Sequence, residues 1–451
     1  MTTRSCLSIV LAAGLGTRMK SDLPKVMHEI GGLPLVGHVL KALGRAGSDR
    51  ISVVTGPDMP ELATLVRDLA PHARCCVQTD RLGTAHAVLA AKPALELESD
   101  DVLVLFGDTP LVTPETIAKV RQGLERGADL VVLGFQTRNP FGYGRLLVEN
   151  GRLVAIREEK DASEAERKVT YCNSGIMGIT GKHALSLLEA IGNDNAKKEY
   201  YLTDAVEIAN ERGLTVVAVT GSETETQGIN TRAQLAACEA AFQNRMRHAA
   251  MDEGCSLLAP QTVFFSHDTK LDADVIVEQN VVFGPGVKVS SGARIRAFSH
   301  LEGATVGTGS VVGPYARLRP GAVLGSDTRV GNFVEVKNAT FGPGAKVNHL
   351  SYIGDASVGS KSNIGAGTIT CNYDGYLKHR TEIGANSFVG SNSTLVAPVK
   401  LGNGVFVSAG SVITDNVSKD SLAFGRARQV VKEGKAKVLR ERLQAEKDAK
   451  Y

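Results

Sequence analysis

The sequence contains no tryptophan, and only 5% of its 451 residues are aromatic. It also lacks any apolar run that approaches the roughly 18 residues of a membrane-spanning helix, so we expect no membrane association. The formal net charge of +3 is too small for a chain of this length to indicate nucleic-acid binding. These absences leave small molecules as the expected partners.

Cysteine is also sparse, with seven residues that form no Cys-x-x-Cys pair and no metal-like cluster. Reduced thiols and a cytoplasmic setting are therefore expected. Arg4 and the apolar run 6–13 imitate a short secretory signal, but the same residues fit a buried strand that leads into a phosphate loop better. With 43% hydrophobic and 22% charged residues, the chain has a globular composition and the length for two or three domains.

One periodicity organises the C-terminal half. Over residues 265–413 an apolar residue returns at every sixth position, with one-residue slips and one break, and a small or β-branched residue usually follows four places later. A helix has a period of about 3.6 and a strand one of about 2, so this spacing indicates a parallel β-solenoid with stacked columns. Only the first and fifth places of each hexad are expected to point inward.

The repeat resembles that of the hexapeptide transferases, and the resemblance implies a left-handed parallel β-helix with three hexads per triangular coil. The count fails between about Cys371 and Glu382, which predicts a projecting loop. A straight prism has no concave pocket, so another chain should complete any ligand site. The family implies a homotrimer. A Gly-rich disordered segment, the alternative, does not keep two apolar columns in register.

In the N-terminal half, strand-like and helical patterns alternate. This predicts an α/β, Rossmann-like domain with a mostly parallel sheet that binds ligands at the carboxyl ends of its strands. The predicted strands are 6–11, 51–55, 75–78, 102–106 and 130–135, and the predicted helices are 35–43 and 114–124.

The first predicted strand leads into a loop that contains Gly14 and Gly16, followed by Arg18 and Lys25. Two glycines let backbone N–H groups approach a phosphate, and the two cations add positive charge. The glycine pair alone also fits a tight strand-to-helix turn, and the third glycine of the dinucleotide fingerprint is missing. With both cations, the segment resembles the signature of sugar-phosphate nucleotidyltransferases, which implies catalytic roles for Arg18 and Lys25.

This resemblance also implies which residues contact the base, the metal ion and the sugar. Gln78 can donate to and accept from a pyrimidine edge at once, which suits a reader of uridine. Asp108 follows a predicted strand, and the resemblance names it and Asn230 as ligands of a phosphate-bridging Mg²⁺. Arg81 stands where the family often has Gln, and His28 and His86 receive no functional role. The positions implied to bind the uridine nucleotide and its sugar are Leu11, Ala12, Ala13, Gly14, Lys25, Gln78, Gly83, Thr84, Gly144, Glu158, Asn173 and Asn230.

Residues 231–251 switch to helical spacing, with Leu235, Cys238, Phe242, Met246 and Ala249 on one face. We interpret this segment as a linker helix whose apolar stripe packs between domains. The expected division is a nucleotidyltransferase domain at 1–229, a linker helix at 230–252, a β-helix acetyltransferase domain at 253–429 and a charged tail at 430–451.

Outward-facing residues of the solenoid match one acetyltransferase pattern. His349 is the candidate general base, because a histidine with a pKa near about 6.5 can take a proton from an attacking amine. Glu335 is expected to orient its ring. The resemblance implies that the sugar and its phosphate contact Arg319, Lys337, Tyr352 and Asn363, with Asn372 and Tyr373 beside them, and that acetyl-coenzyme A contacts Ala366, Asn372, Tyr373, Ser391, Ala409 and Arg426.

Both halves, in this order, resemble the bacterial bifunctional N-acetylglucosamine-1-phosphate uridyltransferases and glucosamine-1-phosphate acetyltransferases. The resemblance implies acetylation of glucosamine-1-phosphate by acetyl-coenzyme A, then uridylyl transfer from UTP with release of pyrophosphate, giving a precursor of peptidoglycan and lipopolysaccharide. Two alternatives remain. One is a single-function sugar-1-phosphate nucleotidyltransferase with an oligomerising or regulatory β-helix, and the other is a non-catalytic assembly subunit with the same two folds.

Overall fold

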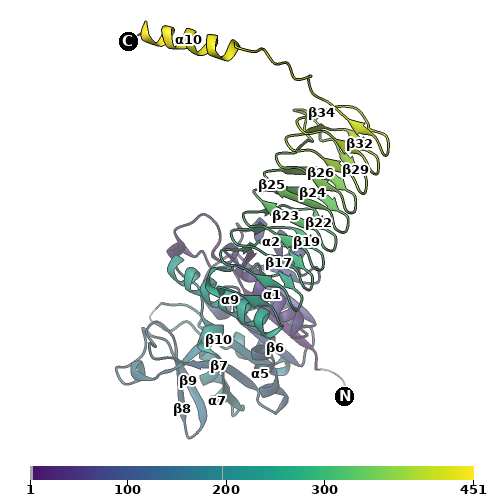
Figure 1. The fold of residues 1–451 in the computed structure, drawn as a ribbon. Coiled ribbons are helices and arrows are strands. Elements are labelled where there is room, and N and C mark those ends of the chain that lie inside the picture. Colours follow the sequence, from purple (N-terminus) through teal and green to yellow (C-terminus); the bar gives the residue numbers. More distant parts are fainter. Residues whose placement is uncertain (1–3, 196, 451) are drawn as a thin grey trace. The chain divides into compact units, whose positions relative to one another are not determined.

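The computed structural model describes residues 4–195 and 197–450, which form two compact units (Figure 1). The first unit runs up to Ala249 and includes Phe265–His267. The second comprises Ala250–Phe264 and the chain from Asp268 onward.

A mixed sheet forms the centre of the first unit, with the strand order β11-β7-β10-β6-β1-β4-β5. β10 is antiparallel to its neighbours β6 and β7, and the other neighbours along this order are parallel. All five predicted strands are confirmed. The strands are β1 (Cys6–Leu11), β4 (Arg50–Thr55), β5 (Arg74–Val77), β6 (Asp101–Phe106), β7 (Leu130–Gln136), β10 (Tyr171–Thr180) and β11 (Val216–Thr220), with a hairpin of β8 (Arg145–Glu149) and β9 (Arg152–Arg157) and a small ribbon of β2 (Glu29–Ile30) and β3 (Leu33–Pro34).

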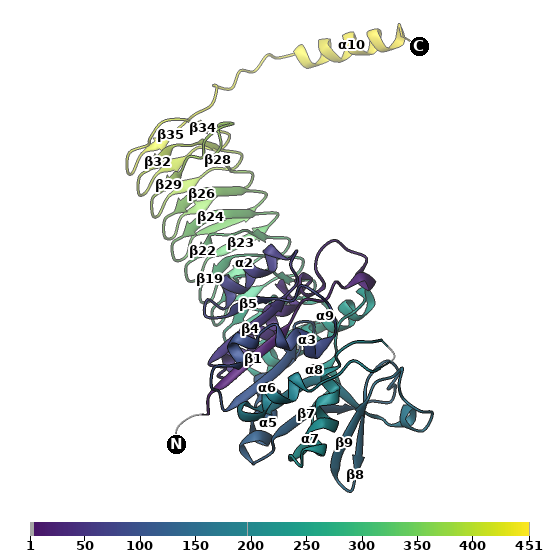
Figure 2. The ribbon, with the colours of Figure 1, turned by 180° about the vertical axis from the view of Figure 1, so that it is seen from behind.

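Helices cover both faces of this sheet, because its strands are apolar on both sides. Leu7 and Ile9 belong to one buried cluster, while Cys6 and Val10 belong to the other. Figure 2 views the face that carries α3 and α6. The helices are α1 (Leu35–Arg45), α2 (Pro60–Leu69), α3 (Thr84–Leu89), α4 (Lys92–Leu95), α5 (Pro114–Glu125), α6 (Gly181–Glu189), α7 (Ala205–Glu211) and α8 (Glu223–Thr226).

The second unit is the predicted β-solenoid, a left-handed parallel β-helix. Its short strands stack into three faces. The first face holds β12 (Ser256–Leu257), β14 (Ile276–Val277), β17 (Arg294–Ile295), β20 (Val311–Val312), β23 (Arg329–Asn332), β25 (Lys346–His349), β27 (Asn363–Ile364), β30 (Phe388–Val389), β33 (Phe406–Val407) and β35 (Leu422–Ala423). The other two faces share β24 (Glu335–Phe341) and β26 (Tyr352–Val358), which turn a corner. Their remaining strands are β13 (Lys270–Leu271), β16 (Lys288–Val289), β19 (Ala304–Val306), β22 (Ala322–Leu324), β29 (Thr381–Ile383) and β32 (Val399–Leu401) on one face, and β15 (Val282–Phe283), β18 (His300–Leu301), β21 (Arg317–Leu318), β28 (Ile369–Cys371), β31 (Thr394–Val396) and β34 (Val412–Ile413) on the other.

The hexad pattern explains this packing. The first-place residues are buried throughout, and they stack in register, as Val312, Val330, Val347 and Ile364 do. The coils extend further than the sequence pattern indicated, because β12 precedes the first hexad and β35 follows the last. The predicted projecting loop is confirmed: residues 372–380 leave the solenoid between β28 and β29, and Tyr376 at their centre is 92% exposed.

Helix α9 (Arg232–Asp252) forms where a linker helix was predicted. Cys238 and Phe242 are buried in a cluster with Met19, Ile30, Leu35, Leu111 and Ile229, all of the first unit. Ala249 is exposed, and Ala250 is buried instead. This part of the stripe therefore packs α9 onto the first unit.

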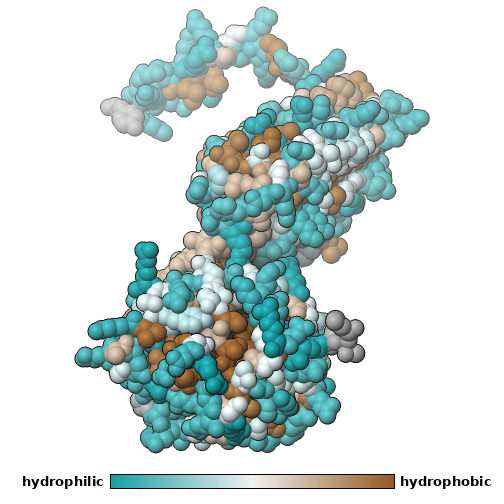
Figure 3. Space-filling view, turned by 90° about the horizontal axis from the view of Figure 1, so that it is seen from below, coloured by the Kyte–Doolittle hydropathy of each residue, from teal (hydrophilic) through white to brown (hydrophobic). Residues whose placement is uncertain are grey.

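The charged segment near the C-terminus forms α10 (Lys435–Asp448), which has no buried residue. Tyr451 lies outside the described residues. Among the described residues, no helix combines the length and the apolar character needed to cross a membrane. Figure 3 shows the visible face of each unit as mostly hydrophilic, with separate apolar patches.

Candidate functional sites

A cavity of about 440 Å³ opens at the carboxyl ends of β1 and β6. The sheet places it there because the parallel strands end at one edge, where connecting loops carry the polar side chains. Its walls include the predicted Leu11, Ala12, Ala13, Gly14, Lys25, Gln78, Gly83, Thr84, Asp108 and Asn230, together with Arg81 and Glu199.

Two glycines shape this cavity. Gly16 has a φ of +64°, and a Cβ on it would lie 2.5 Å from the Cβ of Lys25. Gly83 has a φ of +119°, and a Cβ there would meet the backbone of Tyr200 at 2.5 Å. Only glycine allows both the left-handed backbone and these close approaches. Gly16 therefore lets Lys25 pack against the phosphate loop, and Gly83 lets the start of α3 pack against the backbone of Tyr200.

Lys25 joins the two predicted metal ligands. Its ammonium group forms an ion pair with the carboxylate of Asp108 and donates to the amide oxygen of Asn230 at 3.1 Å. Two oxygen donors from distant parts of the sequence thus converge on one cation. This donor set fits Mg²⁺, which usually takes one or two protein oxygens and completes its shell with phosphates and water. Among the described residues, no group of three or more His, Cys, Asp and Glu side chains forms an all-protein metal site.

Arg18, predicted to be catalytic, is not part of this cavity wall. It lies exposed in a short 3-10 segment, Thr17–Met19, just beyond Gly16. Arg81 is in the wall, and its Nε donates to the carbonyl oxygen of Ala13 at 2.8 Å. Arg81, the residue that departs from the family pattern, therefore has a structural role that sequence reasoning missed. Its hydrogen bond holds the β5–α3 connection against the phosphate loop.

His86, which received no role from the sequence, contacts the predicted uracil reader. The side-chain nitrogen Nε2 of Gln78 lies 3.2 Å from Nδ1 of His86 and donates to the carbonyl oxygen of Gly83 at 3.3 Å. The Gln78 side chain is buried within the wall of the nucleotide cavity. No sequence motif signals this contact, because it depends on how α3 folds back beside the end of β5.

A second cavity of about 270 Å³ shares Thr84, Phe106 and Asp108 with the first. Gly144, Glu158 and Asn173, the predicted sugar positions, lie in its wall. A Cβ on Gly144 would be 3.3 Å from Oε1 of Glu158 and 3.5 Å from the Cβ of Asn173, so the three converge. The shared wall makes the two cavities neighbours, as a nucleotide and a sugar phosphate require for direct transfer.

One further residue of this wall was missed by sequence reasoning. Thr203 is 8% exposed, and its hydroxyl has no hydrogen-bond partner among the described residues. The hydroxyl of the neighbouring wall residue Thr84 accepts a hydrogen bond from the backbone N–H of Leu202 at 2.9 Å, which holds the Thr203 segment in place. A buried polar group without a partner is costly, so a ligand hydroxyl or amide in this cavity suits Thr203.

Two carboxyl groups, one in the wall of the sugar cavity and one next to the wall residue Thr203, have perturbed acidity. Burial raises the pKa of Glu158 above its ordinary value, and nearby Lys197 acts in the opposite direction. Burial, assisted by the charges of Glu207 and Asp161, raises the pKa of Asp204 to about 6. Such shifts mark places where the protein restricts solvation, as ligand sites commonly do.

On the solenoid, His349 is exposed at the end of β25. Asn332 ends β23 and pairs in register with it, and the amide oxygen of Asn332 lies 2.6 Å from Nδ1 of His349. Both line a hollow of about 270 Å³, together with Arg296 and Arg329. With Nδ1–H donating to Asn332, the lone pair of Nε2 remains available to take a proton.

The expectation that Glu335 orients this ring is wrong. Its carboxylate accepts a hydrogen bond from Arg319 at 2.8 Å and lies 3.8 Å from Arg317. The reason is the coil geometry: Glu335 begins β24, beyond the corner that follows Asn332, and stacks between Arg317 and Tyr352. Glu335 therefore orients the predicted phosphate-binding Arg319.

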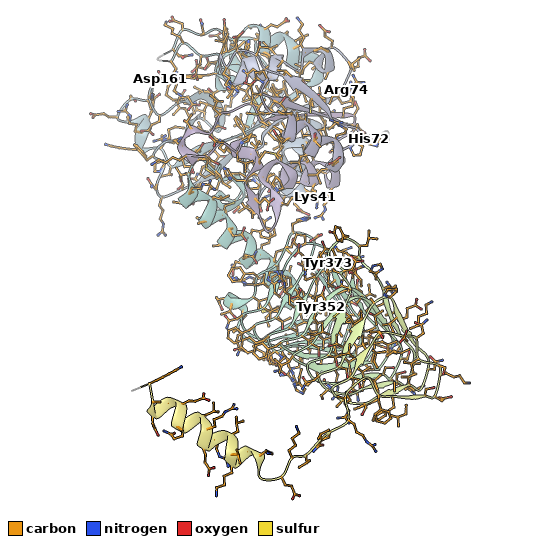
Figure 4. The ribbon with its side chains drawn as sticks, turned by 90° about the horizontal axis from the view of Figure 1, so that it is seen from above. Lys41, His72, Arg74, Asp161, Tyr352 and Tyr373 are labelled. Carbon is orange, nitrogen blue, oxygen red and sulfur yellow. The ribbon has the colours of Figure 1, made fainter. Side chains whose placement is uncertain are left out.

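A buried carboxylate organises the predicted sugar residues of the solenoid. Asp355 accepts from Asn338 at 2.6 Å and from Asn372, and its carboxylate lies 3.8 Å from the ammonium of Lys337. Burial opposes its ionisation, but these contacts outweigh burial and hold the pKa of Asp355 below its usual value. Asn372 also lies 3.5 Å from the hydroxyl of Tyr352. Tyr352 and Tyr373 lie close together on the solenoid (Figure 4).

The predicted acetyl-coenzyme A residues follow one edge of the solenoid away from His349. Backbone bonds link successive coils along it: Gly367 donates to His349 at 3.3 Å, Asn392 to Ala366 at 2.7 Å and Gly410 to Ser391 at 2.8 Å. Ala409 and Arg426 continue this edge, since a Cβ on Gly410 would lie 3.8 Å from Cδ of Arg426. Asn363 begins strand β27, where it pairs with Lys346 of the preceding strand β25 and with Phe388 of the following strand β30.

Comparisons with known proteins agree with both units. Residues 8–170 match the family model of the MobA-like NTP transferase domain. Residues 380–415 match the bacterial transferase hexapeptide model of six repeats. Fold and sites thus define a nucleotidyltransferase joined to a hexapeptide-repeat transferase.

Full-length relatives share this arrangement. The Bifunctional protein GlmU of Agrobacterium fabrum is 56% identical over 447 residues, covering 99% of both chains. That of Azorhizobium caulinodans is 58% identical over 98% of both chains, and that of Bartonella quintana is 53% identical over 99% of this chain and 100% of its own. The chain belongs to the GlmU family. It is a bifunctional uridyltransferase and acetyltransferase that uses Mg²⁺ for uridyl transfer and acetyl-coenzyme A as the acetyl donor.

Proposed function

We propose that the paired cavities of the first unit carry out uridylyl transfer from UTP to N-acetylglucosamine-1-phosphate, with residues in the roles given below. The observation that carries this proposal is the wall shared by the two cavities, in which Asp108 stands between the nucleotide and sugar sides. A sugar phosphate in one cavity can then attack the α-phosphorus of a nucleotide in the other in line, which requires positioning and charge stabilisation more than covalent catalysis.

In this proposal Lys25 and Arg18 offset charge on the transferring phosphoryl group. Asp108 and Asn230 would hold Mg²⁺, which would supply further positive charge, while the ammonium group of Lys25 contacts the phosphates. The contact of Lys25 with Asp108 and Asn230 supports these roles, because one cation reaches both oxygen donors. The nucleotide contacts Leu11, Ala12, Ala13, Gly14, Gln78, Gly83 and Thr84, and the sugar contacts Gly144, Glu158 and Asn173.

We assign acetyl transfer to the His349 region of the solenoid. Nε2 of His349 takes a proton from the amine of glucosamine-1-phosphate as the amine attacks the thioester, and Asn332 holds the ring. The amide C–N bond forms as the C–S bond breaks, and coenzyme A leaves as its thiol after taking up a proton. Arg319 and Lys337 bind the sugar phosphate, and Tyr352, Asn363, Asn372 and Tyr373 bound the sugar. Acetyl-coenzyme A lies along the edge formed by Ala366, Ser391, Ala409 and Arg426, with Asn372 and Tyr373 at its reactive end.

We further propose a homotrimer whose neighbouring solenoid completes this site. Phe298, Tyr315 and Phe333 stack on one another at successive corners, with ring centroids 4.9 and 5.2 Å apart, and each is about half exposed. Exposed stacked aromatic side chains are typical of protein interfaces. Phe333→Glu should shift the molar mass measured by light scattering from trimer towards monomer and reduce acetyl transfer. Phe141→Glu, at an exposed position of the first unit, should change neither, and a trimer that survives Phe333→Glu contradicts this interface.

Domain limits at 1–229, 230–252, 253–429 and 430–451 remain our proposal for the functional division of the chain. A cytoplasmic setting is supported by seven cysteines, all of them free thiols.

The whole assignment is tested by incubating the protein with glucosamine-1-phosphate, acetyl-coenzyme A, UTP and Mg²⁺ and omitting each in turn. Omission of acetyl-coenzyme A should stop formation of the UDP-sugar, and added N-acetylglucosamine-1-phosphate should restore it. A protein that uses N-acetylglucosamine-1-phosphate but never acetylates the amine would instead be a single-function nucleotidyltransferase. One that does neither would be an assembly subunit.

A further inference from the structure

The side-chain amide of Gln78 has only one orientation compatible with its surroundings. It is 4% exposed, and its nitrogen faces both the carbonyl oxygen of Gly83, at 3.3 Å, and Nδ1 of His86, at 3.2 Å. A backbone carbonyl oxygen can only accept, so the atom that faces Gly83 must be the amide nitrogen. With the amide reversed, two oxygens would repel each other at this position.

This orientation fixes the state of His86. Because the nitrogen of Gln78 donates, Nδ1 of His86 must accept, which places the proton of the neutral ring on Nε2. The ring is held on the first turn of α3, beside the ring of Tyr200 at a centroid distance of 6.3 Å. Gly83 is held by its close packing on the Tyr200 backbone. Both acceptors are therefore fixed before any ligand binds.

The consequence concerns what Gln78 can offer to a base. A primary amide nitrogen carries two hydrogens, and here both have partners within the protein. Only the carbonyl oxygen, an acceptor, is left for a ligand in the cavity that Gln78 lines. Gln78 is thus not the two-way donor and acceptor that its residue type alone suggests.

We propose that His86 is a positioning residue that makes the nucleotide site selective for uracil over cytosine, by holding the Gln78 carbonyl oxygen towards N3 of the base. This inference rests on the proposed uridylyl transfer and assigns the base selectivity of that site. Uracil carries a hydrogen on N3 and can donate to the oxygen. Neutral cytosine has a lone pair there, so two acceptors would face each other. The amide cannot turn to suit cytosine without losing both of its hydrogen bonds and facing Gly83 with its oxygen.

The test compares kcat/KM for UTP and CTP, with N-acetylglucosamine-1-phosphate and Mg²⁺, by pyrophosphate release. His86→Phe keeps a ring but removes the acceptor, which frees the amide to turn. We expect kcat/KM for UTP to fall about 10- to 100-fold and the preference for UTP over CTP to fall at least about tenfold. His86→Asn is the matched variant, because its Oδ1 takes the place of Nδ1, and it should restore most of both.

A purely structural role of His86 predicts a different result. In that case the UTP and CTP activities of His86→Phe fall in parallel, or the preference stays unchanged, and the inference is overturned. Failure of a folded His86→Asn to restore selectivity also overturns it. His86→Leu, which equally lacks an acceptor, replaces His86→Phe if the latter does not fold, as judged by thermal melting. A wild-type protein that releases no pyrophosphate from UTP refutes the proposed function itself, which separates the two failures.

Discussion

The hydrogen bond between Asn332 and His349 provides a quantitative prediction for the acetyl-transfer site. Asn332→Ala removes the oxygen that lies 2.6 Å from Nδ1 of His349. As the ring takes a proton from the amine it becomes an imidazolium, so this hydrogen bond changes from a neutral to a charged one. Hydrogen bonds to charged groups contribute about 1.5–3 kcal/mol, against about 0.5–1.5 kcal/mol for neutral ones.

The difference acts only as charge develops, so it lowers kcat and leaves KM nearly unchanged. A loss of about 1–1.5 kcal/mol corresponds to a fall in kcat of about 5- to 15-fold. His349→Ala, which removes the base itself, should cost more, about 10²- to 10⁴-fold. The assay follows the free thiol of coenzyme A released during acetylation of glucosamine-1-phosphate, over a range of pH.

Two further variants give this prediction its controls. Asn332→Asp places a carboxylate beside the ring, which stabilises the imidazolium form and should move the acidic limb of the kcat profile to higher pH. Glu335→Gln weakens the ion pair with Arg319 and should raise KM for the sugar phosphate without moving that limb. If Asn332→Ala keeps its kcat, or if Glu335→Gln moves the limb, the pairing of Asn332 with His349 does not serve catalysis.

Two other predictions concern the first unit. Asp204 has a folded pKa of about 6, above its ordinary 3.8, mainly because of burial. The folded state therefore favours the protonated form, and the cost of ionising Asp204 grows as pH rises from about 4 and is complete above about 6. Discounted for partial exposure, Asp204→Asn should stabilise the protein by about 1–2 kcal/mol at pH 8 and by nothing at pH 4, and an equal melting temperature at pH 8 contradicts this. Chelation by EDTA should abolish uridylyl transfer, with recovery on adding Mg²⁺, and leave acetyl transfer intact; loss of both activities would contradict a metal site confined to Asp108 and Asn230.

The solenoid illustrates which features the sequence predicts well. Each hexad encodes its inward side chain directly, so the buried columns follow from periodicity alone. Side-by-side contacts on the outer surface depend instead on the coil length. Asn332 stacks beside His349 in the neighbouring coil, and Asp355 stacks beside Asn338 in the same way. Counting one coil back from each of these residues would have found both, whereas matching Glu335 to the acetyltransferase pattern gave no information on which side chain it contacts.

In the first unit, too, the sequence predicts where residues lie along a strand but not which side chains they contact. Asp108 and Gln78 lie at strand ends, so the sequence places them at the ligand edge. The contacts of Arg81 with Ala13 and of His86 with Gln78 arise only when the β5–α3 connection folds against the sheet. No spacing along the chain carries that information. The stripe of α9 was found for the same reason as the hexads, but its packing partner was not, because periodicity identifies a buried face without identifying what covers it.

The central claim is that two independent sites, one in each unit, catalyse the two reactions. The most direct test measures both half-reactions separately in Lys25→Ala and His349→Ala. We expect Lys25→Ala to lose most uridylyl transfer and keep acetyl transfer at the wild-type rate, and His349→Ala to show the reverse. If either substitution lowers both rates together in a folded protein, the two sites are not independent and the account is wrong.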